Sequence, residues 1–330
     1  MSADHEISLK GHVNWRNFYV RRLFRIAPAY YLAAIVFVAL DSTRYREASG
    51  VLAFVTFANT WVLSDVGQGL VPGAWSISVE FMFYLALPAV IRFCGTVPRA
   101  IALLCASVAT AVAINTLVPL LQSDDISRTR IADFLYFSIW NQLPVFAIGN
   151  VLYVGWYRRR VAEIESTLYQ PNAPGRQSVD RRLMLLSLVG LVFIAFIPLP
   201  RAFDSSLIPP SFFVTSLLLA VFSLSVVSDQ PRWVVNASVA AIGRVSFSAY
   251  LAHWIVLDVL KTSPAGEWLA AQSRFTSIAG YFAATLLVAT TTWLIASVTY
   301  KWIEKPGMQL GRYAASLNVN HGSAVKQVIS

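Results

Sequence analysis

The sequence predicts an all-α integral membrane protein, a bundle of about eight transmembrane helices with both termini in the cytoplasm. Long apolar runs recur along the chain, and most are long enough to cross a bilayer at about 1.5 Å per residue. Of its 330 residues, 56% are hydrophobic and 13% are charged, whereas about 25% are charged in soluble domains. The lipid bilayer is therefore the expected surrounding. Basic residues beside membrane spans explain the net charge of +9 without a nucleic-acid partner.

The first span is expected over residues 23–40, after a polar and basic leader. The apolar run 51–63 is too short for a comfortable span, so it is interpreted as a re-entrant or surface-lying segment. The polar tail, residues 307–330, is expected to be disordered, and residues 1–330 are expected to form a single membrane domain. The other spans are expected at residues 75–93, 100–121, 132–156, 183–199, 208–227, 239–260 and 278–303.

The orientation follows from the basic residues, because cytoplasmic loops collect Lys and Arg. The loop 157–182 holds the densest arginine cluster. If this loop is cytoplasmic and 51–63 does not span, the large majority of the 26 Lys and Arg residues lie inside. Residues 41–74 are then external.

A polar stripe in the run WSISVEFMFYLALP (75–88) is the first candidate site. Ser76, Glu80 and Tyr84 are four residues apart and share one helix face. A carboxylate at membrane depth costs about 2.5–3.5 kcal/mol and by default marks a functional site. The alternative is that Glu80 pairs with a neighbouring helix and only fixes packing.

Two arginines begin the first span. Arg22 and Arg25 lie on the same side of a helix and can together hold phosphates by forked hydrogen bonds. The alternative is a topological anchor that reaches the lipid headgroups. Glu304, at the end of the last span, is expected at the same level, where an ion pair with one of the two arginines is the simplest interpretation.

The span 239–260 carries Ser246, Tyr250 and His253 on one face. An imidazole can accept a hydroxyl proton as a general base, but His253 can equally be a packing residue. In the orientation above, His253 and Glu80 lie in the outer half of the bilayer, where they could face one cavity. Asn141 precedes Pro144, whose expected kink frees carbonyls that need partners.

Four stretches, in this order along the chain, together resemble the acyltransferase 3 family of integral-membrane acyltransferases. They are FYVRRLFRIAP (18–28), WSISVEFMFYLALP (75–88), GRVSFSAYLAHW (243–254) and IEKP (303–306). The resemblance implies transfer of an acyl group, in most members acetyl, from cytoplasmic acyl-CoA to a hydroxyl of a carbohydrate. Exopolysaccharide, lipopolysaccharide O-antigen or another glycan is the implied acceptor, and a bacterial-type inner (plasma) membrane is the implied location.

The resemblance also assigns roles to residues. Family members usually begin with two further helices, the first carrying a spaced Arg–His pair that is absent here. The chain is therefore expected to lack these helices. The resemblance places Arg22 and Arg25 at the acyl-CoA and points to Glu80 and His253, which are expected to be catalytic. Residue chemistry adds Trp75, Ser78, Tyr250 and Asn141 as expected substrate-binding residues, and no metal is expected.

Two other functions stay open. Intramembrane polar residues such as Glu80, His253 and Asn141 are also typical of a transporter for a glycan precursor or a small anion. A chain without the first two family helices can also be an inactive fragment. The sequence specifies neither the acceptor sugar nor the oligomeric state.

Overall fold

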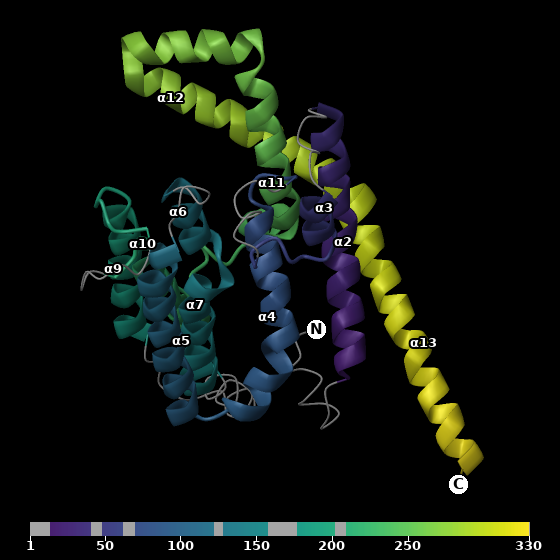
Figure 1. The fold of residues 1–330 in the computed structure, drawn as a ribbon. Coiled ribbons are helices and arrows are strands. Elements are labelled where there is room, and N and C mark those ends of the chain that lie inside the picture. Colours follow the sequence, from purple (N-terminus) through teal and green to yellow (C-terminus); the bar gives the residue numbers. More distant parts are fainter. Residues whose placement is uncertain are drawn as a thin grey trace. The chain divides into compact units, whose positions relative to one another are not determined.

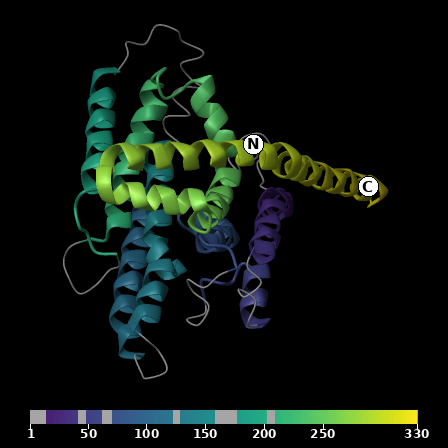
Figure 2. The same ribbon diagram turned by 90° about the horizontal axis from the view of Figure 1, so that it is seen from above.

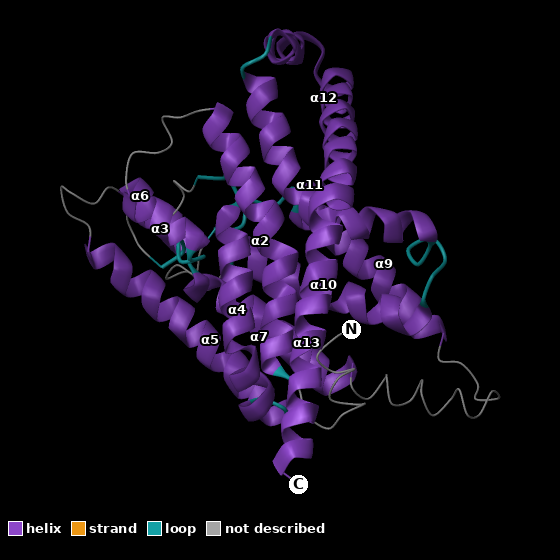
Figure 3. Cartoon of the chain, turned by 90° about the vertical axis from the view of Figure 1, so that its right-hand side faces the viewer, coloured by secondary structure: helices purple, strands orange, loops and turns teal. Residues whose placement is uncertain are grey.

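The computed structural model of the chain describes residues 14–40, 48–61, 70–121, 128–157, 177–201 and 209–329. Every regular element in these ranges is a helix (Figure 1; Figure 3), which confirms the all-α prediction. The chain forms two compact units. The first unit comprises Met1–Val51, Leu70–Ala74 and Ala241–Ser330, and the second comprises Leu52–Gly69 and Trp75–Ala240. The single membrane domain over residues 1–330 stays a prediction.

Seven of the described helices are long and apolar enough to cross a membrane, judged by length and composition. The chain is therefore an integral membrane protein with several spans. The eighth expected span, 183–199, corresponds to α9 (Gln177–Ile194), which is not among the seven. This helix ends early because Pro198 and Pro200 follow it. The seven candidate spans are Trp15–Leu40, Ala74–Phe93, Val97–Leu121, Arg128–Trp156, Ser211–Ser228, Ala237–Lys261 and Gly280–Leu317.

The first unit is formed by the first helix and by helices from the end of the chain. A π-helical turn, η4 (Tyr300–Glu304), joins two long helices so that the backbone stays helical throughout (Figure 2). The last helix lies alongside the first (Figure 1). The helices of this unit are α2 (Trp15–Leu40), α11 (Ala237–Lys261, from Ala241 onward), α12 (Pro264–Thr299) and α13 (Lys305–Ile329).

Two glycines set how closely α13 approaches α2. A Cβ atom at Gly307 would lie 2.6 Å from the backbone oxygen of Phe24, and one at Gly311 would lie 2.8 Å from the Cβ of Phe24. Ala315, one turn further on, is also buried. Small residues four apart let helix backbones approach each other closely in membranes. This packing holds α13 against α2 as far as Ala315. The helix continues to Ile329, whereas the sequence predicted a disordered tail over residues 307–330.

We expect Gly307→Ala to destabilise the fold and Gly243→Ala to leave it unchanged or slightly more stable. A methyl group forced against the α2 backbone costs about 1–3 kcal/mol. Gly243 lies in α11 with no further heavy atom within 4 Å of its Cβ position, so alanine there gains about 0.5–1 kcal/mol in helix propensity. Thermal unfolding of the detergent-solubilised chain measures both effects. Equal shifts for the two variants would contradict the close approach of α13 to α2.

The second unit is built from the middle helices. α5 packs along α7, and α9 packs along α10, which also contacts α7 (Figure 1). Because long apolar faces pair along their length, these helices form a continuous bundle within the unit. Its helices are α4 (Ala74–Phe93, from Trp75 onward), α5 (Val97–Leu117), the 3₁₀ turn η2 (Val118–Leu121), α6 (Arg128–Phe137), α7 (Ile139–Leu152), the π-helical turn η3 (Tyr153–Tyr157), α9 and α10 (Ser211–Asp229).

The expected span 132–156 is divided into two helices, and the break is at Ser138. This residue adopts an extended backbone conformation, with ψ of 148°, between α6 and α7. Pro144, where the sequence predicted a kink, lies inside α7. The predicted interruption therefore exists, but it occurs six residues earlier in the chain.

Two side chains from α7 satisfy carbonyl groups at the end of α6. The amide of Asn141 donates to the carbonyl of Leu135, and the amide of Gln142 donates to the carbonyl of Tyr136 at 3.2 Å. Asn141 also accepts a 2.6 Å hydrogen bond from Asn115 of α5. Backbone carbonyls that leave a helix inside a membrane need such partners. The structure thus explains why polar residues occur in this apolar segment.

The described part of the segment 51–63 consists of the end of a short helix, α3 (Ala48–Val55), followed by turns up to Trp61. Eight residues extend about 12 Å, far less than the bilayer core. Phe57, just after this helix, has a left-handed backbone (φ 58°), and its ring stacks on Phe81 of α4 at 4.4 Å between centroids. The described part of the segment is therefore a packed, non-spanning element of its unit.

The loops on which the orientation prediction depends are residues 41–47, 62–69 and 158–176. They lie outside the described residues. The cytoplasmic position of both termini accordingly stays a prediction.

Candidate functional site

His253 is half-buried on α11 between two aromatic side chains. Its ring centroid lies 5.4 Å from that of Tyr250 and 4.7 Å from that of Trp254, both in tilted arrangements. Packed rings restrict the rotation of an imidazole and so fix the direction of its nitrogens. This placement is suited to a general base, which has to be held in one orientation.

A tight turn at Gly73 packs against Tyr250 and Trp254, the two aromatic side chains beside His253. The Tyr250 hydroxyl donates to the Gly73 carbonyl at 2.8 Å. Gly73 has φ of 78°, and a Cβ atom there would lie 2.3 Å from Nε1 of Trp254. Only glycine satisfies both requirements. The buried Trp254 Nε1 has no hydrogen-bond partner among the described residues, so this donor is held beside His253 without a committed acceptor.

The two arginines of α2 differ in their surroundings. Arg22 is half-buried, with its Cζ 5.4 Å from the centroid of the Phe18 ring, a cation–π distance. Arg25, one turn further on, is exposed. The ion pair expected between one of these arginines and Glu304 stays a prediction.

Glu304 is the most deeply buried acidic or basic side chain among the residues of the first unit whose exposure is described, at 1% exposed. Its Oε2 accepts a 2.8 Å hydrogen bond from the hydroxyl of Ser248, which is itself 1% exposed. The sequence interpretation selected Ser246 instead, but that side chain is exposed and donates to the carbonyl of Gly243. Residues Val245, Ser248, Leu251 and Ala252 form the buried face of α11, so the apolar spacing around Ser248 could have identified it.

The Glu80 stripe is present as predicted on α4. Ser76, Glu80 and Tyr84 are all half-buried. The Tyr84 hydroxyl donates to the Glu80 carboxylate, one turn along the same helix. The stripe therefore pairs Glu80 with a residue of its own helix, which holds the carboxylate in place.

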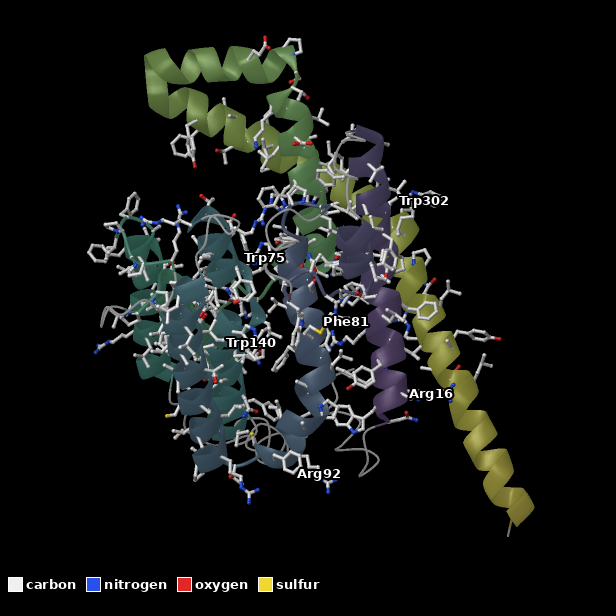
Figure 4. All side chains as sticks on the ribbon, in the orientation of Figure 1. Arg16, Trp75, Phe81, Arg92, Trp140 and Trp302 are labelled. Carbon is white, nitrogen blue, oxygen red and sulfur yellow. The ribbon has the colours of Figure 1, made fainter. Side chains whose placement is uncertain are left out.

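Trp75 lies near one end of α4, and Arg92 lies near the other (Figure 4). The Trp75 ring packs against Phe137 and Tyr136, with centroid distances of 5.0 Å and 6.0 Å. Trp140 of α7, also shown in Figure 4, contacts the half-exposed Trp61 at 5.5 Å. Aromatic rings thus gather in the second unit around the start of α4 and the break between α6 and α7.

Ser78 and Asn141, both expected to bind substrate, have no exposed surface. The Ser78 hydroxyl donates to Oδ1 of Asn59, which ties the turn after α3 to α4. Asn141 is committed to Leu135 and Asn115, as described above. These hydrogen bonds fix the backbone around Trp75 and Glu80.

The candidate residues divide between the two units. Arg22, Arg25, Tyr250 and His253 belong to the first unit, and Trp75, Ser78, Glu80 and Asn141 belong to the second. The shared cavity of Glu80 and His253 stays a prediction. Among the described residues, no three His, Cys, Asp or Glu side chains come together in a way that could hold a metal ion.

A family model described as an acyltransferase domain, that of the acyltransferase 3 family, matches residues 3–296. The matched range contains the arginine pair of α2, the Trp75–Glu80 helix and His253, whereas Glu304 lies just beyond it. Comparisons with curated proteins and with solved structures gave no match. Because the match covers most of the chain and the helices can span a membrane, the chain belongs to the acyltransferase 3 family and is a membrane acyltransferase.

Proposed function

We propose that the chain transfers an acyl group, most often acetyl, from acyl-CoA to a hydroxyl of a cell-envelope carbohydrate. Exopolysaccharide, lipopolysaccharide O-antigen or a similar glycan is the proposed acceptor, and a bacterial-type inner membrane is the proposed location. The observation that carries the proposal is that Arg22, Arg25 and His253, from opposite ends of the chain, belong to one compact unit. This unit therefore combines an anion-binding pair with a candidate general base.

The arginine pair supports an acyl-CoA donor. CoA carries phosphates that two guanidinium groups can hold by charge-assisted hydrogen bonds. Arg25 is exposed, so its guanidinium is available to a ligand. The guanidinium of Arg22 lies at cation–π distance from the ring of Phe18, which restricts its position. We assign both residues to the donor.

His253 supports the chemical step. We propose that the thioester arm of a donor held by Arg22 and Arg25 extends to the imidazole of His253, which belongs to the same compact unit. His253 takes the proton of the acceptor hydroxyl as its oxygen attacks the thioester carbonyl carbon. The carbon–sulfur bond then breaks, the proton passes to the sulfur, and the products are an ester and free CoA thiol.

The second unit supports acceptor binding. Glu80 presents a carboxylate, held by Tyr84, that can accept hydrogen bonds from sugar hydroxyls. Trp75 presents an aromatic ring of the kind on which a sugar ring stacks. Ser78 and Asn141 are fully buried and cannot touch the acceptor directly. We propose that they support acceptor binding by holding in place the backbone that carries Trp75 and Glu80. Tyr250 acts similarly on His253 through its hydrogen bond to Gly73.

The role of Arg25 is testable in membrane vesicles that contain the chain, supplied with acetyl-CoA labelled in the acetyl group. We expect Arg25→Ala to lower kcat/KM for acetyl-CoA by about 10- to 150-fold, since a hydrogen bond to a charged group contributes about 1.5–3 kcal/mol. Arg25→Lys should recover only part of this loss, because a point charge cannot replace a planar fork.

Arg16→Ala is the matched control, because Arg16 is an exposed arginine on the same helix, two to three turns earlier (Figure 4). It should transfer label at the normal rate. Full activity of Arg25→Lys would show that Arg25 is only a topological anchor. Label that never enters glycan in the unmodified chain, with several acyl-CoAs tried, would contradict the proposed function itself.

A further inference from the structure

Two tryptophans of the second unit, Trp61 and Trp140, pack against each other and have no role in the site described above. Their ring centroids lie 5.5 Å apart in a T-shaped arrangement. Such a contact places the edge of one ring against one face of the other, so it leaves the remaining ring faces uncovered. Trp61 is 47% exposed and Trp140 is half-buried. The pair therefore presents open aromatic surface.

The Trp61–Trp140 pair adjoins the proposed acceptor site around Trp75. The Trp75 ring contacts Phe137 at 5.0 Å between centroids. Phe137 and Trp140 both pack against one buried apolar cluster of α6. The cluster consists of Ile131, Phe134 and Leu135. Packed side chains of one compact unit thus connect Trp75 to the tryptophan pair.

Buried polar side chains fix the backbone beside both members of the pair. The Ser78 hydroxyl of α4 donates to Asn59, two residues before Trp61. Asn141, the residue after Trp140, is held by hydrogen bonds to α5 and α6. All three of these polar residues are at most 4% exposed. A ligand site needs side chains that are held in one geometry by such supporting hydrogen bonds, so the pair is preorganised.

We propose that Trp61 and Trp140 form a second sugar-binding subsite, through which the chain recognises an acceptor of at least two linked sugars. This inference rests on the proposed function, in which Trp75 and Glu80 bind the acceptor. The face of an indole ring is apolar and carries partial negative charge, so it attracts the C–H groups on one face of a sugar ring. The ligand of the subsite is a sugar that neighbours the acylated one in an oligosaccharide or polysaccharide.

Exposure alone does not identify this subsite, because aromatic side chains also gather where a membrane meets water. Trp233 belongs to the same unit and is 54% exposed. The Asn236 amide that donates to its backbone carbonyl is itself exposed. Beside Trp61 and Trp140, by contrast, the supporting hydrogen bonds are made by buried side chains. Trp233 is therefore the matched control for the pair.

The test uses the purified full chain in detergent and two probes, the tetrasaccharide and the monosaccharide fractions of a partially hydrolysed envelope glycan. Trp61→Ala should weaken tetrasaccharide binding, measured by isothermal titration calorimetry, by about 5- to 30-fold, as for truncation of a well-packed aromatic contact residue. In acetyl transfer, KM for the tetrasaccharide should rise by the same factor, while kcat and KM for the monosaccharide stay unchanged. Trp61→Phe should retain most of the affinity, and Trp233→Ala should behave as the unmodified chain.

The outcomes separate this inference from the proposed function. If the tetrasaccharide binds through Trp61 but receives no acetyl group, the subsite stands and the proposed function is wrong. If Trp61→Ala leaves tetrasaccharide binding and KM unchanged, the subsite is wrong. An equal loss with the monosaccharide, or in Trp233→Ala, would also contradict the subsite, because packing or membrane anchoring does not depend on glycan length.

A second variant covers the case in which Trp61→Ala does not fold. Trp61→Leu keeps apolar bulk against Trp140 and removes the aromatic face. It should show the same loss for the tetrasaccharide alone, and normal tetrasaccharide affinity in this variant would overturn the inference.

Discussion

His253→Ala is expected to lower the turnover number by about 10²- to 10⁴-fold, the usual contribution of a positioned general base. The fold should be nearly unaffected. His253 is only half-buried, and its neighbours Tyr250 and Trp254 are held independently against the Gly73 turn. The measurement is the rate of acetyl transfer per folded protein, with the thermal unfolding midpoint recorded for each preparation.

Ser246→Ala is the matched control, because Ser246 lies on the same helix with its side chain exposed. It should retain normal turnover and stability. A large fall in the unfolding midpoint of His253→Ala, with normal turnover of the protein that remains folded, would show that His253 is a packing residue.

Glu80→Gln is expected to give the second large effect, a well-folded protein with strongly reduced turnover. Gln keeps the shape of Glu and still accepts the hydrogen bond from Tyr84, but it carries no charge. Fold stability should change little, since the Tyr84 contact survives and Glu80 is only half-buried. Transfer rate per folded protein, measured over a range of acceptor concentrations, shows whether the loss lies in acceptor binding or in turnover.

Tyr84→Phe provides the comparison for Glu80. It keeps the charge and removes the hydroxyl that holds it, so a partial loss of turnover is expected. If Glu80→Gln instead unfolds at a much lower temperature while its folded fraction works normally, Glu80 stabilises packing and takes no part in acceptor binding.

Seven of the eight expected spans were predictable because each depends on a local property, an apolar run of sufficient length. The same reasoning excluded 51–63, whose described part, up to Trp61, contains the short helix α3 and turns. The helix break was located less well. Pro144 indicated an interruption, but the break occurs at Ser138, where side chains from the following helix can satisfy the freed carbonyls. Such long-range compensation is not visible as a sequence pattern.

The candidate site shows the same limit. The spacing of Ser76, Glu80 and Tyr84 correctly predicted a stripe on one helix, because helical periodicity is local. The link between Ser248 and Glu304 joins residues that are 56 positions apart, so spacing alone could not reveal it. The structural role of Gly307 and Gly311 in α13 likewise becomes apparent only from their close approach to Phe24 of α2. Tertiary packing, more than local pattern, decides which polar side chains meet.

The most direct test of the account is the stoichiometry of the reaction. The purified chain is reconstituted into liposomes with acetyl-CoA and an extracted envelope glycan, and free CoA thiol and new acetyl ester are measured together. The account predicts equal molar amounts of thiol and ester, both dependent on the glycan and both lost in His253→Ala. Thiol release without ester, movement of glycan across the membrane without acetylation, or undiminished ester formation by His253→Ala would contradict it.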